Sequence, residues 1–300
     1  MKTELPAGTT STLKAHQDPQ VPEIVIQANR RLLHLDLRAL WQYRDLLLLL
    51  IRRDFLAKYK QTVLGPVWFI VQPLATTLIF TVVFSRIAKI STDGVPAPIF
   101  YLTGLLVWNY FQTAFSGVSG SLAANAGVFG KVFFPRLIPA IATTTSALVS
   151  VLIQAITWIV VYWMIKSSHP DADSFGITIY AVLFPLLLLQ TAALAMGFGL
   201  LMASVTAKYR DLSFTMGFIM QAWLYLTPII YPLSSVPEHW QWLAAVNPMT
   251  AMVEACRGML LGETVMTATM YLSSLGVTIV ALCVGVVVFN RVQRTFVDIL

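Results

Sequence analysis

Residues 41–68 read WQYRDLLLLLIRRDFLAKYKQTVLGPVW, and this stretch decides the fold. The apolar run 46–51 has charged residues on both sides, so it is far too short to cross a bilayer, which takes about 20 apolar residues. Further on, Gly65 interrupts a helix and Pro66 suits the first turn of the next one. We predict that residues 35–61 form an amphipathic interface helix lying flat at the cytosolic boundary of a membrane.

This helix has more apolar surface than a membrane anchor needs. One face about 120° wide, typical of a helix at an interface, holds Leu37, Leu40, Trp41, Leu47, Leu48, Ile51 and Phe55. Leu46, Leu49 and Leu50 point elsewhere, so the helix is apolar all round for a turn and a half. That pattern favours a helix packed between the membrane domain and another protein. An anchor that touches only lipid headgroups is the alternative.

The composition indicates an integral membrane protein. The 300 residues are 57% hydrophobic and 11% charged, whereas an ordinary soluble domain has about 25% charged residues. The formal net charge of +6 does not by itself indicate nucleic acid, because in a membrane chain the position of Lys and Arg matters more than their sum. The two cysteines lack metal-ligand spacing, and we expect the polar residues 1–34 to form a retained cytosolic tail.

Six stretches are long and apolar enough to span. They are approximately 66–87, 99–121, 137–165, 177–206, 212–231 and 268–289. An even number of spans puts both termini on one side, and with cytosolic termini 16 of the 20 Lys and Arg residues lie inside. The segment 232–267 is too polar to span and too apolar for a free loop, which predicts a re-entrant outer helix pair. The expected fold is therefore all-α, with a six-span domain over 62–300.

Several activities are disfavoured by the residues that are missing. The cores of the six spans contain no Asp, Glu, Lys, Arg or His, which disfavours a proton-coupled carrier. The sequence GVFGKV at 127–132 lacks the spacing of a phosphate-binding loop, so the chain does not bind ATP by that means. A glycan-modifying enzyme that uses His169 and Asp171 of an external loop remains an alternative.

The connection 122–139, LAANAGVFGKVFFPRLIP, places Phe133 and Phe134 between Lys131 and Arg136. Exposed aromatic rings flanked by cations are typical of docking into a groove on a partner. Elsewhere, Glu254 and Arg257 stand three residues apart on a predicted helix and can pair, either as a latch or as a satisfied pair at the membrane surface.

Four motifs carry a resemblance to a known family. They are TVLGPVW at 62–68, KVFFPR at 131–136, YRD at 209–211 and NPM at 247–249. In this order, over residues 35–300, the chain closely resembles the membrane subunits of type-2 ATP-binding-cassette exporters, in the branch that exports polysaccharide, O-antigen and teichoic acid. The resemblance implies a homodimer in the bacterial inner membrane, joined to two copies of a cytosolic ATPase that holds ATP and Mg. This chain would then hold no cofactor and would not be an enzyme.

The resemblance also implies roles for particular residues. Residues expected to couple to the ATPase are Leu48, Arg52, Arg53, Lys131, Phe133, Phe134, Pro135 and Arg136. Residues expected at the outer gate are Trp240, Trp242, Asn247, Pro248, Glu254 and Arg257.

A path for sugar chains needs aromatic faces and neutral hydrogen-bonding groups. The expected substrate-path residues are Trp68, Phe69, Gln72, Trp108, Tyr110, Phe111, Trp223 and Tyr225, with Asn109, Gln112 and Tyr231 beside them. Because Trp and Tyr gather at both interfaces of any membrane protein, an interface belt is the alternative.

The sequence therefore predicts the permease subunit of an ATP-driven exporter of a lipid-linked, O-antigen-like polysaccharide. A teichoic acid, capsule or drug exporter of the same family is an alternative, as is an ATP-independent channel or lipid scramblase. We expect no nucleic-acid partner.

Overall fold

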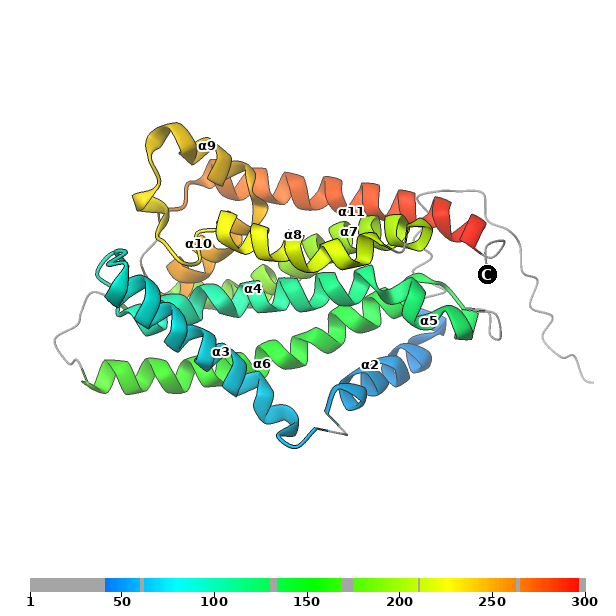
Figure 1. The fold of residues 1–300 in the computed structure, drawn as a ribbon, viewed down its shortest axis with the longest axis horizontal. Helices are drawn as coiled ribbons and strands as arrows, with labels where there is room; N and C mark the ends of the chain where they lie inside the picture. The colour runs from blue at the N-terminus through cyan, green and yellow to red at the C-terminus, as the bar shows by residue number, and fades with distance from the viewer. Residues whose placement is uncertain are drawn as a thin grey trace, which may run out of the picture.

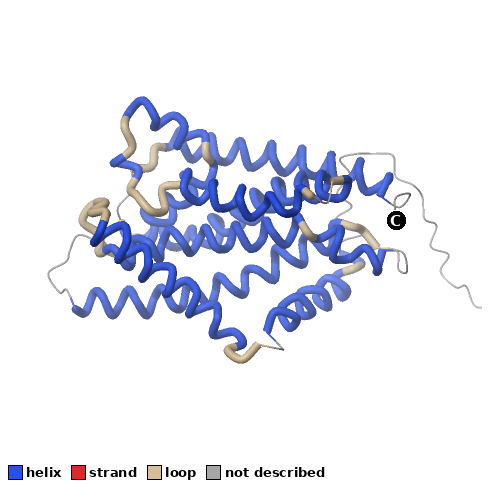
Figure 2. Tube along the Cα trace, viewed as in Figure 1, coloured by secondary structure: helices blue, strands red, loops and turns tan. Residues whose placement is uncertain are grey.

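The computed structural model describes residues 41–59, 62–129, 134–168, 175–209, 211–262 and 265–296. Every regular element within them is helical (Figure 2), as an all-α chain requires. The longer helices are α2 (Arg44–Tyr59), α3 (Trp68–Phe80), α4 (Ala97–Ser119), α5 (Ser121–Phe129), α6 (Leu137–Ser168), α7 (Phe184–Lys208), α8 (Leu212–Leu226), α9 (Glu238–Val246), α10 (Pro248–Leu261) and α11 (Ala268–Phe296). Short 3-10 turns cover Gly65–Val67, Ile179–Leu183 and Leu233–Ser235, and a π-helical segment, Thr81–Ile87, extends α3.

The long helices run roughly side by side, with α9 and α10 at one end of the bundle and α5 near the other (Figure 1). We call these the α9 end and the α5 end. Helix α4 lies at the centre, where it packs against α6, α7, α10 and α3. Its large side chains are buried, among them Tyr101, Trp108 and Phe115. Helix α2 lies obliquely across α6 near the α5 end (Figure 1).

Within the described ranges, four helical stretches are long and apolar enough to cross a membrane: Gly65–Ile87, Leu137–Ser168, Ile179–Lys208 and Ala268–Gln293. They coincide with the first, third, fourth and sixth predicted spans. The second predicted span forms α4, and the fifth forms the shorter α8. Helix α8 ends at Leu226 rather than at residue 231, because Thr227 is extended before Pro228.

Glycines let α7 and α11 approach each other closely. A Cβ atom on Gly197 would lie 2.6 Å from the backbone of Ala281 and Leu282, and Gly285 faces Gly197 in the same way. Gly199 makes a similar approach to Val118 on α4. Small residues at such crossings let helices pack without an aqueous driving force, so α4, α7 and α11 form one tightly packed unit.

Between α8 and α11 the chain forms the two short helices α9 and α10. Pro237 stands before α9, Pro248 occupies the first turn of α10, and Gly262 ends α10 with a φ of 83° that only glycine adopts freely. Helix α10 is buried at nearly every position, whereas Trp240 and Trp242 of α9 are exposed. The two helices therefore differ: α10 belongs to the core and α9 lies on its surface.

Candidate functional site

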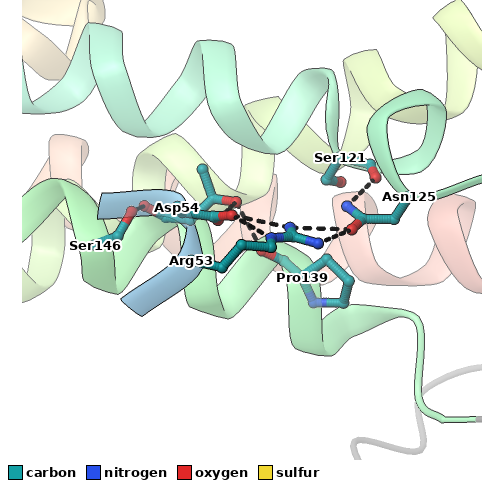
Figure 3. A network of polar contacts seen from close by, with 7 residues as sticks. Arg53, Asp54, Ser121, Asn125, Pro139 and Ser146 are labelled. Carbon is teal, nitrogen blue, oxygen red and sulfur yellow. Dashed lines mark hydrogen bonds and ion pairs between the residues drawn. The ribbon is translucent and has the colours of Figure 1, made fainter. Parts of the chain in front are cut away.

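A polar joint connects α2 to α5 and α6 near the α5 end (Figure 3). Both terminal nitrogens of Arg53 donate to Oδ1 of Asn125, at 3.2 Å each, and Arg53 also pairs with Asp54 at 2.9 Å. Asp54 in turn accepts a hydrogen bond of 3.4 Å from the hydroxyl of Thr143 on α6. One arginine and one carboxylate on adjacent positions of α2 thereby reach two other helices.

Each partner in this joint is itself held in place by its own helix. The amide nitrogen of Asn125 donates to the carbonyl of Ser121 at 2.9 Å. The single hydroxyl proton of Thr143 is shared between the carbonyl of Pro139, at 2.8 Å, and the more distant Asp54. Such local bonds fix the side chains before α2 docks. The Asn125 carbonyl oxygen is therefore aimed at α2, and the joint is buried on the bundle side.

An apolar contact accompanies the joint. Leu50 is buried with Phe134, Ile138 and Ala142. Leu50 lies outside the main apolar face predicted for this helix, and Leu47 and Ile51 of that face pack beside it, whereas Leu48 of the same face is exposed. Leu50 and Leu48 differ in exposure because one side of α2 faces α6 and the other faces away from the bundle.

The residues expected to couple to an ATPase fall into three groups. Leu48 and Arg52 are exposed on α2, and Arg53 belongs to the joint. Lys131 and Phe133 lie outside the described residues.

The third group lies where the chain enters α6. The expectation that Phe134 is exposed is wrong, because it is 5% exposed. Pro135 is half-buried, and Arg136 donates to the backbone carbonyl of Gln293 on α11. Burial lowers the pKa of the Arg136 guanidinium from its ordinary value, because desolvation disfavours the charged form. Phe134 and Arg136 thus hold the start of α6 against α2 and α11, and a role toward a partner stays a prediction for both.

A cleft of about 510 Å³ lies between α3, α4 and α6. Of the expected substrate-path residues, the structure brings Phe69 and Gln72 into it, together with Asn109 and Gln112. The Nδ2 atom of Asn109 donates to Oε1 of Gln154 across the cleft at 3.0 Å.

The other expected path residues lie elsewhere. Trp108, Tyr110 and Phe111 are at most 1% exposed and pack inside the central core, so in this conformation they line no open surface. Trp68 and Tyr225 are about half exposed outside the cleft, on α3 and α8. Hydropathy alone gives no direction for a ring in a span, which is why the sequence groups these residues and the structure separates them.

At the α9 end, Asn247 joins α8 to α10. Its Oδ1 atom accepts from Nε1 of Trp223 at 2.9 Å and from the backbone nitrogen of Met249 at 3.0 Å, which caps α10. Its Nδ2 atom donates to the hydroxyl of Thr227 at 2.9 Å. Trp223, expected in the substrate path, therefore serves this junction.

Beneath this junction lies the ion pair that the sequence spacing predicts. Arg257 donates to Glu254 at 2.7 Å, and each side chain is only 4% exposed. The predicted pairing is confirmed and both side chains are buried inside the protein, while a role as a latch or as a satisfied pair at the membrane surface stays a prediction. A second nitrogen of Arg257 donates to the carbonyl of Ile229 at 3.1 Å, and the guanidinium lies 3.7 Å from the ring of Phe100. The pair connects α10 to α4 and to the segment after α8.

Sequence reasoning missed the partners of the polar joint. Nothing in the sequence singles out Asn125, Thr143 or Asp54, since each is an ordinary polar residue within its segment. Gln154 and Ser150 offered a weak signal, because with Thr143 they recur at helical spacing on one face of a predicted span.

The chain was compared with known proteins. Residues 45–261 match the family model of the ABC-2 type transporter. The O-antigen export system permease protein RfbA of Klebsiella pneumoniae is 26% identical over 85% of this chain and 95% of its own length, and that of Myxococcus xanthus is 24% identical over 87% and 97%. The polysialic acid transport protein KpsM of Escherichia coli is 25% identical over 68% and 77%.

The matched residues run from the start of α2 to the end of α10 and include the polar joint, the cleft and the buried ion pair. The resemblance that the motifs indicated is confirmed: this chain belongs to the ABC-2 type transporter family of membrane proteins.

Proposed function

We propose that this chain is the permease subunit of an ATP-driven exporter that moves a lipid-linked polysaccharide across the bacterial inner membrane. The observation that carries the proposal is the match along nearly the whole length of permease proteins whose names specify O-antigen export. A relative that matches through one helix pair would support only a fold, whereas these matches cover 95% and 97% of the relatives' own lengths.

The proposed topology has six spans with both termini in the cytosol. The four long apolar helices support it, and α4 and α8 supply the remaining two crossings. The arrangement puts α2 and α5 on the cytosolic side, where most Lys and Arg residues lie, and α9 with α10 on the outer side as a re-entrant pair. In this arrangement the buried pair Glu254–Arg257 holds the outer end of the protomer together.

The proposed source of energy is a separate ATPase that docks at the cytosolic end. Leu48, Leu49 and Leu56 of α2 are exposed on the side away from α6. A row of exposed leucines on a helix that is already docked supports a protein cover on that face. Two copies of this chain and two of the ATPase would form the transporter. Within each chain, residues 1–34 would be the cytosolic tail, 35–61 the interface helix and 62–300 the six-span domain.

The proposed substrate is a polysaccharide, because relatives named for O-antigen and for polysialic acid both match over most of the chain. The neutral polar cleft between α3, α4 and α6 supports a hydroxyl-rich cargo over a proton or metal ion. A channel or scramblase that works without ATP is the second candidate. The exposed leucines of α2 favour an ATP-driven exporter over it, because they support docking of a partner protein.

Affinity purification from mild detergent tests the partner. We expect a soluble ATPase to co-purify in stoichiometric amount with the native chain and to be lost with Leu48→Ser. The matched control is Ile279→Ser, which alters an exposed apolar residue on α11 far from α2. If the native chain purifies without any ATPase and still passes glycan across vesicle membranes, the proposed energy source is wrong.

A further inference from the structure

We infer that the cleft between α3, α4 and α6 is a binding site, within one protomer, for an uncharged, hydroxyl-rich segment of a sugar chain. The inference rests on the proposed function and adds to it a location and a chemical preference. Its volume of about 510 Å³ falls in the range of roughly 300–1,000 Å³ that is usual for small-molecule sites.

Two facing stripes of neutral polar residues line the cleft. On α4, Asn109, Gln112 and Ser116 follow the spacing of one helix face, and on α6, Ser150 and Gln154 do the same. Facing polar stripes on membrane helices normally bond directly to each other. Here only Asn109 and Gln154 do so, and the remaining polar groups border open volume.

Direct contacts between α4 and α6 flank the cleft along the bundle. Toward the α9 end, the Nε1 atom of Trp158 donates to the hydroxyl of Thr103 at 2.7 Å, beyond the bond from Asn109 to Gln154. Toward the α5 end, Gly117 lies so close to Thr143 that a Cβ atom on the glycine would overlap its methyl group.

Two exposed amides that border the cleft have hydrogen-bonding capacity to spare. Among the described residues, the side-chain amides of Gln72 on α3 and Gln112 on α4 make no hydrogen bond, although both border the cleft. A primary amide offers two donors and an acceptor, which suits the mixed donors and acceptors of sugar hydroxyls. In the low-dielectric membrane these groups would gain more from a polar occupant than from an acyl chain.

The α3 wall supplies an apolar complement. Phe69 and Pro73 line the cleft on this side, one helical turn apart, with Gln72 between them. A pyranose ring presents C–H faces as well as hydroxyls, so an apolar wall opposite polar stripes suits it on both counts. Every described lining residue is uncharged, which disfavours phosphate and carboxylate groups as the occupant.

Site-specific photocrosslinking in cells that make the glycan tests the inference. A benzophenone amino acid replaces Gln112 in one variant and Leu152, which is 60% exposed on the far side of α6, in the control. After illumination and denaturing purification, covalently attached carbohydrate is detected by periodate oxidation. We expect carbohydrate on the Gln112 variant, none on the Leu152 variant, and loss of the adduct when Ser116→Trp fills the cleft. Gln190→Leu, which removes an intramembrane amide outside the cleft, should leave the adduct intact.

The outcomes separate this inference from the proposed function. Equal labelling at the two positions, no carbohydrate at either, or an acyl-chain adduct at Gln112 would overturn the cleft assignment, while export by the native chain in the same cells would uphold the proposed function. If the native chain fails to restore export to cells that lack it, the proposed function fails and the inference fails with it.

Discussion

The guanidinium of Arg53 on α2 donates two hydrogen bonds to the same oxygen of Asn125 on α5, at 3.2 Å each. Since the side chain of Arg53 is 45% exposed, solvent weakens the bonds, and we assign them about 1 kcal/mol together. That is small against the stability of the bundle. It is large enough to decide whether α2 and α5 move as one body when a partner pushes on either.

We therefore predict that Asn125→Leu uncouples ATP hydrolysis from export. The purified complex should keep its ATPase activity and its thermal stability within about 1 kcal/mol, because the lost bonds contribute no more than that. Export per ATP hydrolysed, measured in proteoliposomes, should fall. Arg44→Ala removes an exposed arginine of the same helix and is the control, with normal coupling expected. Unchanged coupling in Asn125→Leu would show that the joint transmits nothing.

Phe134→Ala should mainly lower the stability of the chain rather than weaken binding of a partner. The ring is buried against Leu50, so its removal leaves a cavity that typically destabilises by about 3–5 kcal/mol. We expect a lower midpoint of thermal unfolding in detergent, together with faster proteolysis of α2. Leu48→Ser should leave that midpoint unchanged, since Leu48 is exposed. An unfolding midpoint that is normal in Phe134→Ala would restore the docking role predicted from the sequence.

Gly197→Ala should loosen the contact between α7 and α11. Its Cβ atom would meet backbone atoms 2.6 Å away, which cannot rotate aside, so the two helices must separate. Overpacking of this kind destabilises by about 1–3 kcal/mol. Gly217→Ala is the matched control, because a Cβ atom there meets nothing within 4 Å. The comparison needs only the thermal midpoints of the two variants, and equal midpoints would contradict the packing described for Gly197.

The buried pair Glu254–Arg257 yields a prediction about single and double variants. Glu254→Leu leaves a buried guanidinium with no counter-charge, which typically destabilises by about 3–5 kcal/mol. The double variant Glu254→Leu/Arg257→Met removes both charges and should recover much of that loss. Thermal unfolding in detergent measures both. A double variant less stable than Glu254→Leu would mean that Arg257 acts mainly through Ile229 and Phe100 rather than through its acidic partner.

We predict that Asn247 stabilises the fold mainly through its acceptor oxygen, Oδ1. Asn247→Ala loses the cap of α10 and the bond from Trp223, and the lost cap alone is worth about 0.5–2 kcal/mol. Asn247→Asp keeps an oxygen for both donors and loses the donations to the hydroxyl of Thr227 and, at 3.4 Å, to the carbonyl of Leu226. Thermal midpoints should therefore fall in the order native, Asp, Ala. The reverse order of the two variants would place the main contribution on the amide nitrogen.

Much of the fold could be predicted because the bilayer constrains it. Long apolar runs located the four helical stretches that are long and apolar enough to span, and prolines located the breaks around α9 and α10. The pair Glu254–Arg257 followed from its spacing along one helix. Its burial did not follow, because that depends on how α10 packs against α4.

The candidate site could be predicted only in part. The sequence indicated Phe69 and Gln72 as residues suited to a sugar path. The location of the cleft could not be predicted, because it depends on where α3 crosses two other helices. Trp108 and Phe111 are aromatic residues of the kind expected to line a substrate path, but their rings are buried in the core. Helix periodicity predicts which residues share a face of one helix. It does not predict the bond between Arg53 and Asn125, because these residues are 72 positions apart on two different helices whose relative placement must be known.

The central claim is export of a polysaccharide, and the most direct measurement is the location of the glycan in cells that lack this chain. Deletion should leave lipid-linked polysaccharide on the cytosolic side of the inner membrane and none at the surface. Expression of the native chain should restore the surface glycan. Normal surface polysaccharide in the deletion strain, with no build-up inside, would contradict the account.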